Sequence, residues 1–213
     1  MMHDVRKPSA ALYLPQRRTI PALQQAVQFC KGCDLYKHAT QAVFGRGARK
    51  AQVLLVGEQP GDQEDLRGIP FIGPAGRVLD QALAEAGIER DMVYITNAVK
   101  HFKFEERGRR RIHKKPGMGE IAACRPWLEA EMEAVQPEVL VALGASAAKS
   151  LAGKEIKITR DRGKLFPHPY AKSFIATVHP SSLLRIPDAE EKKIEYARFV
   201  EDLRFVRQQL TSQ

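Results

Sequence analysis

Four short apolar segments constrain the fold more than any other feature of this sequence. They lie at residues 53–56, 93–99, 139–143 and 174–178, are rich in Val, Ile, Leu and Phe, and have the length of buried strands. Segments with helical periodicity separate or follow them, at 75–86, 120–135, 145–151 and 194–210. Because alternating strands and helices favour parallel strands with helices on both faces, we predict an α/β fold. It would be a single three-layer α/β/α domain around a central four-stranded parallel sheet.

The predicted domain spans residues 19–213. Residues 1–18 are polar and basic and contain two prolines, so they are expected to form a flexible lead-in. A further helix is expected at 21–29, with Pro21 in its first turn and its end just before Cys30. A chain of 213 residues is long enough for one well-buried domain and rather short for two.

The ends of the four strands indicate where a ligand binds. In open α/β sheets, ligands bind outside the carboxyl ends of the strands. The segments that follow the strands, at residues 57–61, 97–101, 144–146 and 179–182, are polar or contain Gly, Pro or Ser. We therefore expect them to converge on one edge of the sheet and to form the binding site there.

Three side chains could carry chemistry, two of them in the segments that follow strands. Glu58 lies in a loop whose glycines let backbone amides approach a ligand, although a plain turn with a solvated carboxylate is the alternative. His179 could donate a hydrogen bond to a developing oxyanion, or it could be satisfied by neighbouring backbone. Phe71, in the segment 68–74, could stack on a base or pack in the core.

The charge distribution favours a polyanionic partner. The net charge is +9, and eight Lys and Arg residues between positions 100 and 115 are opposed by only two Glu residues. Cations that meet phosphates release counterions, so nucleic acid is the expected partner. Within this patch, residues 109–115 read Arg-Arg-Arg-Ile-His-Lys-Lys. Nearby cations lower the pKa of a histidine, so His113 could be a neutral nucleophile or base, or it could be incidental to a phosphate-binding loop.

The three cysteines indicate a metal site rather than disulfide bonds. An odd number in a chain without a signal peptide argues against a disulfide framework. Cys30-x-x-Cys33 is half of a metal site, because zinc and iron–sulfur sites usually take four ligands. Cys124 can be the third ligand, and His101 is a candidate for the fourth because His replaces Cys on iron in some clusters. The alternative is that the cysteines are buried thiols.

Six ordered segments resemble the uracil-DNA glycosylase superfamily, in particular its iron–sulfur branch. The resemblance runs from about residue 28 to the C-terminus, and the ordered set is specific although each piece alone is not. The segments are Cys30-x-x-Cys33, 57–61 (Gly-Glu-Gln-Pro-Gly), 70–76 (Pro-Phe-Ile-Gly-Pro-Ala-Gly), 96–100 (Thr-Asn-Ala-Val-Lys), 124–127 (Cys-Arg-Pro-Trp) and 179–185 (His-Pro-Ser-Ser-Leu-Leu-Arg).

Within this branch the chain resembles the UdgX type. Gln59 stands where ordinary family-four enzymes carry Ala or Thr. The basic stretch ending in His113 is absent from ordinary members. It reads Arg-Arg-Arg-Ile-His where UdgX carries Lys-Arg-Arg-Ile-His, so the first residue departs but the charge is kept. His101 follows the Asn-x-x-Lys motif, where ordinary members have a Cys.

The resemblance implies a mechanism. Deoxyuridine is flipped into the pocket, where Phe71 stacks on uracil and Asn97 reads its Watson–Crick edge, rejecting cytosine. His179 stabilises the charge on departing uracil. His113 then captures the sugar at C1′, and Glu58 orients His113 or accepts its proton. The other implied substrate-binding residues are Gly57, Gln59, Asp62, Ser181 and Arg185, and the implied DNA-phosphate contacts are Arg109, Arg110, Arg111 and Lys114.

The resemblance also implies a cofactor and partners. A 4Fe-4S cluster with a structural role would be held by Cys30, Cys33, His101 and Cys124. The substrate would be uracil-containing DNA, with single strands preferred, and uracil would be released. We expect a monomer that does not contact membranes. Because no signal peptide or membrane-spanning run is present in the sequence, we expect a cytoplasmic location.

Three other functions stay open at this point. The first is an ordinary hydrolytic iron–sulfur uracil-DNA glycosylase that releases a free abasic site. The second is a non-catalytic iron–sulfur DNA-binding module, although the presence of Glu58, Asn97 and His179 argues against a decayed site. The third is a nucleotide-binding domain that uses the 57–61 loop on phosphates, which the missing phosphate-loop Lys-Ser/Thr pair disfavours.

Overall fold

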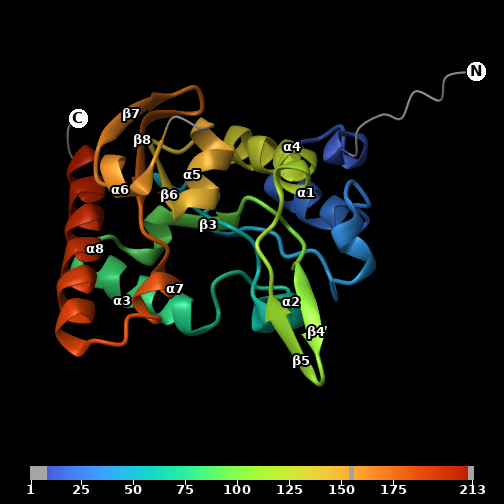
Figure 1. Cartoon of the computed structure of the whole chain (residues 1–213). Coiled ribbons are helices and arrows are strands. Elements are labelled where there is room, and N and C mark those ends of the chain that lie inside the picture. Colours follow the sequence, from blue (N-terminus) through green and yellow to red (C-terminus); the bar gives the residue numbers. More distant parts are fainter. Residues whose placement is uncertain (1–8, 154–155, 211–213) are drawn as a thin grey trace, which may run out of the picture.

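A six-stranded mixed sheet forms the centre of the computed structural model, which describes residues 9–153 and 156–210 (Figure 1). Its four inner strands are β2 (Val53–Gly57), β3 (Val93–Asn97), β6 (Val139–Leu143) and β8 (Ala171–Thr177). They lie in the order β3-β2-β6-β8, and every pairing between them is parallel. The four predicted strands and their parallel direction are therefore confirmed.

The prediction of a purely parallel, four-stranded sheet is wrong at both edges. β1 (Arg46–Gly47) pairs antiparallel with β3, and β7 (Leu165–His168) pairs antiparallel with β8. Neither edge strand has a clear strand signal in the sequence. β1 has only two residues, both exposed, and β7 contains Pro167, which lacks the N–H that a central strand needs. Antiparallel edge strands on an otherwise parallel sheet are common in α/β folds.

Helices cover both faces of the sheet, as predicted. On one face, α3 (Pro74–Glu85) and α8 (Ala189–Leu210) pack against alternate strand residues such as Leu55. On the other face, α4 (Met118–Val135) and α5 (Ala145–Ala152) pack against the residues between them, such as Leu54. Every residue of β2, β3 and β6 is buried, which explains why these strands appear in the sequence as continuous apolar runs.

The N-terminal segment packs beside α4 and forms a third core cluster around Trp127. It contains η1 (Ala10–Tyr13), α1 (Ile20–Val27) and η2 (Asp34–Lys37). η1 falls within the lead-in that was expected to be flexible, yet Ala10 is buried. A Cβ on Gly32 would lie only 2.7 Å from the Ala10 backbone, so this close packing requires a glycine. Residues 1–8 of the expected lead-in lie outside the described residues.

The basic stretch forms a hairpin of its own. β4 (Phe104–Arg107) and β5 (Arg110–His113) pair antiparallel, with Phe104 opposite His113, and a turn at Gly108 with a φ of 60° joins them. The sequence predicts a loop here, whereas the structure shows two paired strands. Figure 1 shows the hairpin projecting from the body of the molecule beside α2 (Asp62–Arg67). Within residues 9–153 and 156–210, its strands pair only with each other.

Three short elements complete the described chain: η3 (Arg90–Met92), α6 (Ile158–Asp161) and α7 (Pro180–Leu183). α7 begins directly after His179, at the segment that follows β8. In the part of the chain that the structure describes, no helix is both long enough and apolar enough to cross a membrane.

Candidate active site

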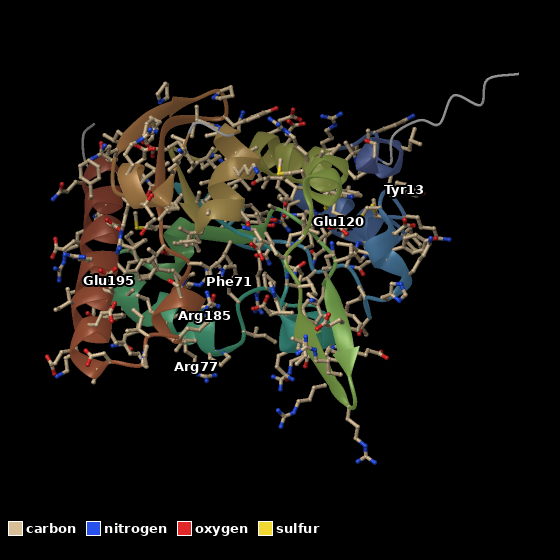
Figure 2. All side chains as sticks on the ribbon, in the orientation of Figure 1. Tyr13, Phe71, Arg77, Glu120, Arg185 and Glu195 are labelled. Carbon is tan, nitrogen blue, oxygen red and sulfur yellow. The ribbon has the colours of Figure 1, made fainter. Side chains whose placement is uncertain are left out.

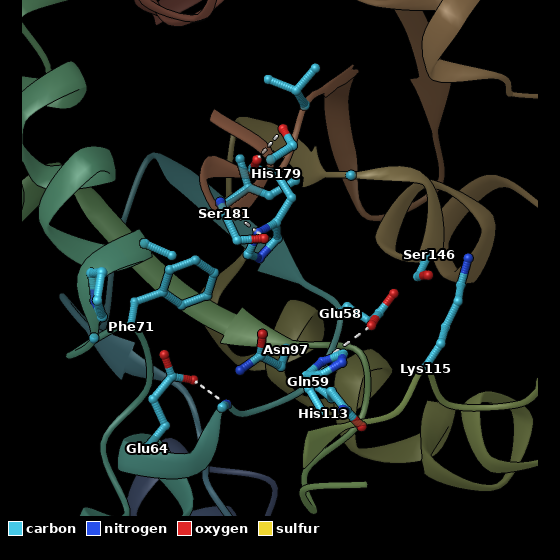
Figure 3. A pocket seen from close by; sticks show the side chains of 18 of the residues that line it. Glu58, Gln59, Glu64, Phe71, Asn97, His113, Lys115, Ser146, His179 and Ser181 are labelled. Atoms are coloured by element: carbon cyan, nitrogen blue, oxygen red, sulfur yellow. Dashed lines mark hydrogen bonds and ion pairs between the residues drawn. The ribbon is translucent and has the colours of Figure 1, made fainter. Parts of the chain in front are cut away.

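A pocket of about 900 Å³ lies at the carboxyl ends of the inner strands, at the predicted edge of the sheet (Figure 3). The segments that follow β2, β3, β6 and β8 all contribute to its walls, together with the Phe71 segment and the end of β5. The predicted site residues that line it are Glu58, Gln59, Asp62, Phe71, Asn97, His113, His179, Ser181 and Arg185.

Asn97, the last residue of β3, offers an unused amide to this pocket. It is 1 % exposed, and neither Oδ1 nor Nδ2 has a hydrogen-bond partner among the described residues. Buried polar side chains are nearly always hydrogen-bonded, so this amide fits a ligand that both donates and accepts. Gly57 makes room for it, because a Cβ there would lie 2.3 Å from Asn97 Oδ1 and 2.7 Å from the Phe71 ring.

Phe71 forms an apolar wall of the pocket in a strained conformation. Its φ of 56° is rare for a residue with a side chain. Two neighbours stabilise this conformation. Gly76 leaves space for the Phe71 carbonyl, which would lie 1.6 Å from a Cβ there, and the Glu64 carboxylate accepts hydrogen bonds from the amides of Gly61, at 3.0 Å, and Phe71. The rings of Phe71 and His179 have centroids 5.8 Å apart.

His179 is arranged as a neutral hydrogen-bond donor. Its Nδ1 accepts a hydrogen bond from the Ser181 amide at 3.1 Å and lies 2.8 Å from Ser181 Oγ, so the ring proton is on Nε2. Burial, together with the charges of Arg185 and His113, lowers the pKa of His179 to about 4. At neutral pH the imidazole can therefore donate to a developing anion. Figure 2 shows Phe71 and Arg185 near the centre of the molecule, where both line the pocket.

His113 and Glu58 form a second pair in the pocket. His113 Nε2 lies 3.5 Å from Glu58 Oε1, and the side chains are 50 % and 22 % exposed. Burial lowers the pKa of His113, an effect that Glu58 opposes and Arg185 reinforces. The lowered pKa was predicted, but its main cause is burial rather than the neighbouring cations. The imidazole is neutral at neutral pH and can act as a nucleophile.

Gln59 ties the hairpin to the pocket. Its Nε2 donates to the carbonyls of Lys103, at 3.1 Å, and Lys114, at 2.9 Å, and its Oε1 accepts from the Lys103 amide at 3.1 Å. Lys103 precedes β4 and Lys114 follows β5, so one buried side chain holds both ends of the hairpin. Gln59 therefore positions the hairpin beside the pocket, and its predicted role in binding the substrate stays a prediction.

Arg111 is a second anchor of the hairpin. Its guanidinium donates to Asp62 Oδ1 and Asp65 Oδ2, both at 2.6 Å, and lies 5.0 Å from the centroid of the Phe104 ring. It is therefore engaged with α2 in the structure. The other basic residues predicted to bind phosphates, Arg109, Arg110 and Lys114, are exposed, and Lys114 forms an ion pair with Glu105. Phosphate binding by these four residues stays a prediction.

A buried ion pair that the sequence analysis missed lies behind Asn97. Lys100 and Glu131 are both 0 % exposed and form a short ion pair. Lys100 Nζ also donates to Thr96 Oγ1 at 2.6 Å and to the Asn97 carbonyl at 2.7 Å. The prediction that Lys100 belongs to the basic patch that meets a polyanion is therefore wrong. Lys100 lies in a basic run and its buried partner is 31 residues further along the chain, so no local pattern indicates the pair.

The three cysteines lie together at the third core cluster. Cys30 and Cys124 are buried in it, and Cys33 packs against it. Trp127 Nε1 donates to Cys30 Sγ at 3.2 Å, and the Lys100 amide donates to Cys124 Sγ at 3.2 Å. Burial raises the pKa of Cys124 to about 12. These sulfur atoms therefore lie in an apolar region with hydrogen-bond donors directed at them.

His101, the fourth predicted ligand, is also buried. Burial lowers its pKa to about 4, so the ring is neutral, as a metal ligand must be. Among the residues that the structure describes, no three His, Cys, Asp or Glu side chains converge closely enough to hold a single metal ion. The predicted ligand set therefore stays a prediction at this point.

Comparison with known proteins assigns the chain to the uracil DNA glycosylase superfamily. The family model with that description matches residues 44–204, so the chain belongs to this superfamily. Among its relatives is a type-4 uracil-DNA glycosylase of Thermotoga maritima, 39 % identical over 173 residues, which are 81 % of this chain and 86 % of the relative. Another is the type-4 uracil-DNA glycosylase of Sulfurisphaera tokodaii, 36 % identical over 178 residues, 80 % of this chain and 78 % of the relative.

A viral protein carries the same kind of sequence within a much longer chain. A DNA polymerase of Bacillus phage SP01 is 32 % identical over 148 residues, which are 69 % of this chain but only 15 % of the polymerase. The resemblance inferred from the sequence motifs is therefore confirmed at the level of the superfamily, with type-4 uracil-DNA glycosylases among the relatives.

Proposed function

We propose that this protein excises uracil from DNA and becomes covalently bonded to C1′ of the resulting sugar through His113. The excision is supported by the superfamily and by relatives that are type-4 uracil-DNA glycosylases. The observation that carries the proposal is the unpartnered amide of Asn97 in one pocket with Phe71 and His179.

Uracil fits the unused amide of Asn97. The N3–H of uracil can donate to Oδ1, and Nδ2 can donate to the carbonyl oxygen at C4 of uracil. Cytosine presents the opposite pattern at these two positions, so binding it would leave buried polar groups unpaired. The ring of Phe71 supplies a face on which a flipped base can stack.

His179 assists departure of the base. As the bond between N1 of uracil and C1′ breaks, the electron pair leaves with uracil and negative charge gathers on its carbonyl oxygens. The Nε2–H of His179 can donate to one of these oxygens, because its other ring nitrogen is occupied by Ser181. The sugar left behind has oxocarbenium character.

His113 then competes with water for the sugar. The lone pair of a neutral imidazole nitrogen forms a bond with C1′, and the proton on the other ring nitrogen passes to a base. The carboxylate of Glu58 lies 3.5 Å from His113 Nε2 and can accept this proton. Gln59 and Arg111 hold the hairpin in place, so His113 is presented at a high effective concentration.

We propose that the cysteines hold an iron–sulfur cluster. Thiolates in an apolar region with N–H groups directed at the sulfur atoms are the environment in which such clusters bind. Ligands of a four-iron cluster surround a cube of atoms rather than one ion, so they need not converge on one point. Cys30, Cys33, Cys124 and His101 would bind it, and it would hold the N-terminal segment against α4.

The substrate and state of the protein follow from this proposal. Uracil-containing DNA is the substrate, and single strands are preferred because extruding an unpaired base costs less. One copy of the domain, from residue 19 to 213, carries every residue of the pocket, so we propose that a monomer acts, in the cytoplasm.

A denaturing gel tests the proposal. The protein is mixed with a labelled single-stranded oligonucleotide that carries one deoxyuridine, boiled and run in detergent, with a thymine oligonucleotide as control. We expect a slow protein–DNA band that depends on uracil and disappears in His113→Ala, while the matched His38→Ala, on the surface and outside the pocket, retains it.

The gel also separates the alternatives. Strand breakage after alkali without a slow band would mean that water is the acceptor, as in a hydrolytic glycosylase. Binding without release of uracil would mean a non-catalytic DNA-binding module.

A further inference from the structure

One short segment joins the pocket to the cysteine site, the group formed by Cys30, Cys33 and Cys124. The segment begins at Asn97, which lines the pocket and whose amide has no hydrogen-bond partner among the described residues. It ends at His101, a buried residue and the fourth proposed ligand of the cluster. Only three residues separate the two. A change of backbone conformation at one end of the segment therefore displaces the other end.

Consecutive backbone amides hold this segment in place. The amides of residues 98 and 99 donate to carbonyls of the 57–61 loop, at 2.9 and 3.1 Å. The next amide, that of Lys100, donates to Cys124 Sγ at 3.2 Å. The segment is thus bonded on one side to a wall of the pocket and on the other side to a proposed ligand of the cluster.

The side chain of Lys100 bonds to the same segment. Its Nζ donates to the Asn97 carbonyl at 2.7 Å and to Thr96 Oγ1 at 2.6 Å. It also forms the short ion pair with Glu131, and both charged side chains are 0 % exposed. Because separating a buried ammonium from its carboxylate is costly, Glu131 fixes the position of Lys100 and, through it, the carbonyl of Asn97.

Helix α4 carries both partners of Lys100. Cys124 and Glu131 are seven residues apart in this helix, which is about two turns, so they lie on one face of it. α4 therefore holds Lys100 at two points, the amide at Cys124 and the ammonium at Glu131. Trp127, on the same helix and 0 % exposed, donates to Cys30 Sγ at 3.2 Å. One helix thus connects the segment that reads the base to the cysteine site.

We propose that Lys100 is a positioning residue that fixes Asn97 against α4, so that binding of uracil and retention of the iron–sulfur cluster stabilise each other. This rests on the proposed function, which assigns Asn97 to uracil and the cysteines to the cluster. A ligand that binds one arrangement of the segment better than others favours that arrangement at both of its ends. The coupling is reciprocal, because each ligand changes the affinity for the other by the same factor. Lys100 thus makes base recognition depend on the cysteine site, which lies outside the pocket.

The rate at which an iron chelator removes the cluster from the full-length protein tests the coupling. Loss of the visible absorbance of the cluster is followed without DNA and with two single-stranded oligonucleotides. One carries a single 2′-fluoro-deoxyuridine, because fluorine slows formation of the sugar cation, and the other carries thymine instead. Each protein receives DNA at about ten times its own Kd, measured by fluorescence anisotropy, so that differences in affinity do not affect the comparison.

Two variants interrupt the link at different points. Lys100→Met with Glu131→Gln removes both buried charges and with them the donor to the Asn97 carbonyl, whereas Asn97→Ala removes the amide that meets the base. The matched control is Arg18→Met with Glu133→Gln. That pair joins the same helix at 2.8 Å, but its side chains are 50 % and 42 % exposed. Circular dichroism at the temperature of the assay shows that each protein is folded.

We expect the uracil strand to slow loss of the cluster about 10-fold in the wild type and in the control protein, which is the mass-action limit at this DNA concentration. The thymine strand, which does not engage Asn97, should leave the rate nearly unchanged. In the Lys100→Met with Glu131→Gln protein and in Asn97→Ala, the uracil strand should have no more effect than the thymine strand.

Two results would overturn the coupling. One is equal protection by the uracil and thymine strands in the wild type, and the other is undiminished protection in the protein without Lys100 and Glu131. Release of uracil from an ordinary deoxyuridine strand is measured separately. Protection that needs uracil and Lys100, without release of uracil, would retain the coupling and reject the proposed catalysis. Release of uracil by a protein that binds no iron would reject the cluster and the coupling and retain the catalysis.

Discussion

Removing the buried ammonium behind Asn97 should destabilise the whole protein. Lys100→Met leaves Glu131 with its charge in the core, although Thr96, Tyr94 and the Gly45 amide still donate to it. Breaking a buried pair by removing one partner costs about 3–5 kcal/mol. For a chain of this size, about 2–4 °C of melting temperature is lost for each kcal/mol, so we expect a fall of about 6–20 °C.

Thermal unfolding followed by circular dichroism measures this effect. Lys103→Met is the matched control, because Lys103 pairs with Glu120 at 2.8 Å but the two side chains are 32 % and 23 % exposed. That pair is worth about 0–1 kcal/mol. The double variant Lys100→Met with Glu131→Gln removes both charges and should recover part of the stability lost in the single variant.

Two results would refute the reasoning. One is a melting temperature of Lys100→Met within about 3 °C of that of Lys103→Met. The other is a double variant whose loss of stability exceeds the sum of the losses in the two single variants.

The same variants report on the active site. The loss of a donor to the Asn97 carbonyl should lower the rate of uracil release, whereas Lys103→Met should leave that rate unchanged within about twofold.

Three further predictions concern the site. Crosslinking needs a neutral His113, whose pKa burial lowers below its usual value of about 6.5, so the initial rate should fall on acidification with a midpoint below that value; a profile centred above pH 7 would contradict this. Gln59→Leu removes three hydrogen bonds to the hairpin, each worth about 0.5–1.5 kcal/mol, and should reduce the crosslink yield in a gel more than uracil release measured by chromatography. Asn97→Ala should slow single-turnover uracil release roughly 30- to 700-fold, from about 2–4 kcal/mol of lost hydrogen bonding, and a smaller effect than tenfold would reject its role in recognition.

The inner sheet could be predicted because it follows from local sequence patterns, and the position of the pocket could be predicted because it follows from a general rule for α/β sheets. Buried parallel strands appear as apolar runs, and ligand sites in such sheets lie at the carboxyl ends of the strands. Glu58 and His179 were singled out because each follows a predicted strand. Phe71 and His113 were candidates from the residues alone, but a Phe and a basic run have common structural explanations, so their roles, like that of Asn97, came from the family resemblance.

The remaining features depend on contacts between residues far apart in the sequence. The pairing of Lys100 with Glu131, and of Arg111 with Asp65, has no local signal, because each side chain alone looks like a surface charge. The buried hydroxyl of Ser146, which lines the pocket without a hydrogen-bond partner among the described residues, has no sequence signal because it depends on the packing around it. The edge strand β1 was missed because two residues carry no periodicity.

The separate pairing of β4 and β5 has a consequence for how such a molecule can vary. Because these strands form no ladder with the central sheet, residues can be added or removed at their turn without shifting the register of any core strand. Only two anchors must be kept: the base of the hairpin, which Gln59 holds, and Arg111, which joins the hairpin to α2. The sequence of the hairpin, which carries His113, can therefore change at a different rate from the sequence of the core that forms the base-binding pocket.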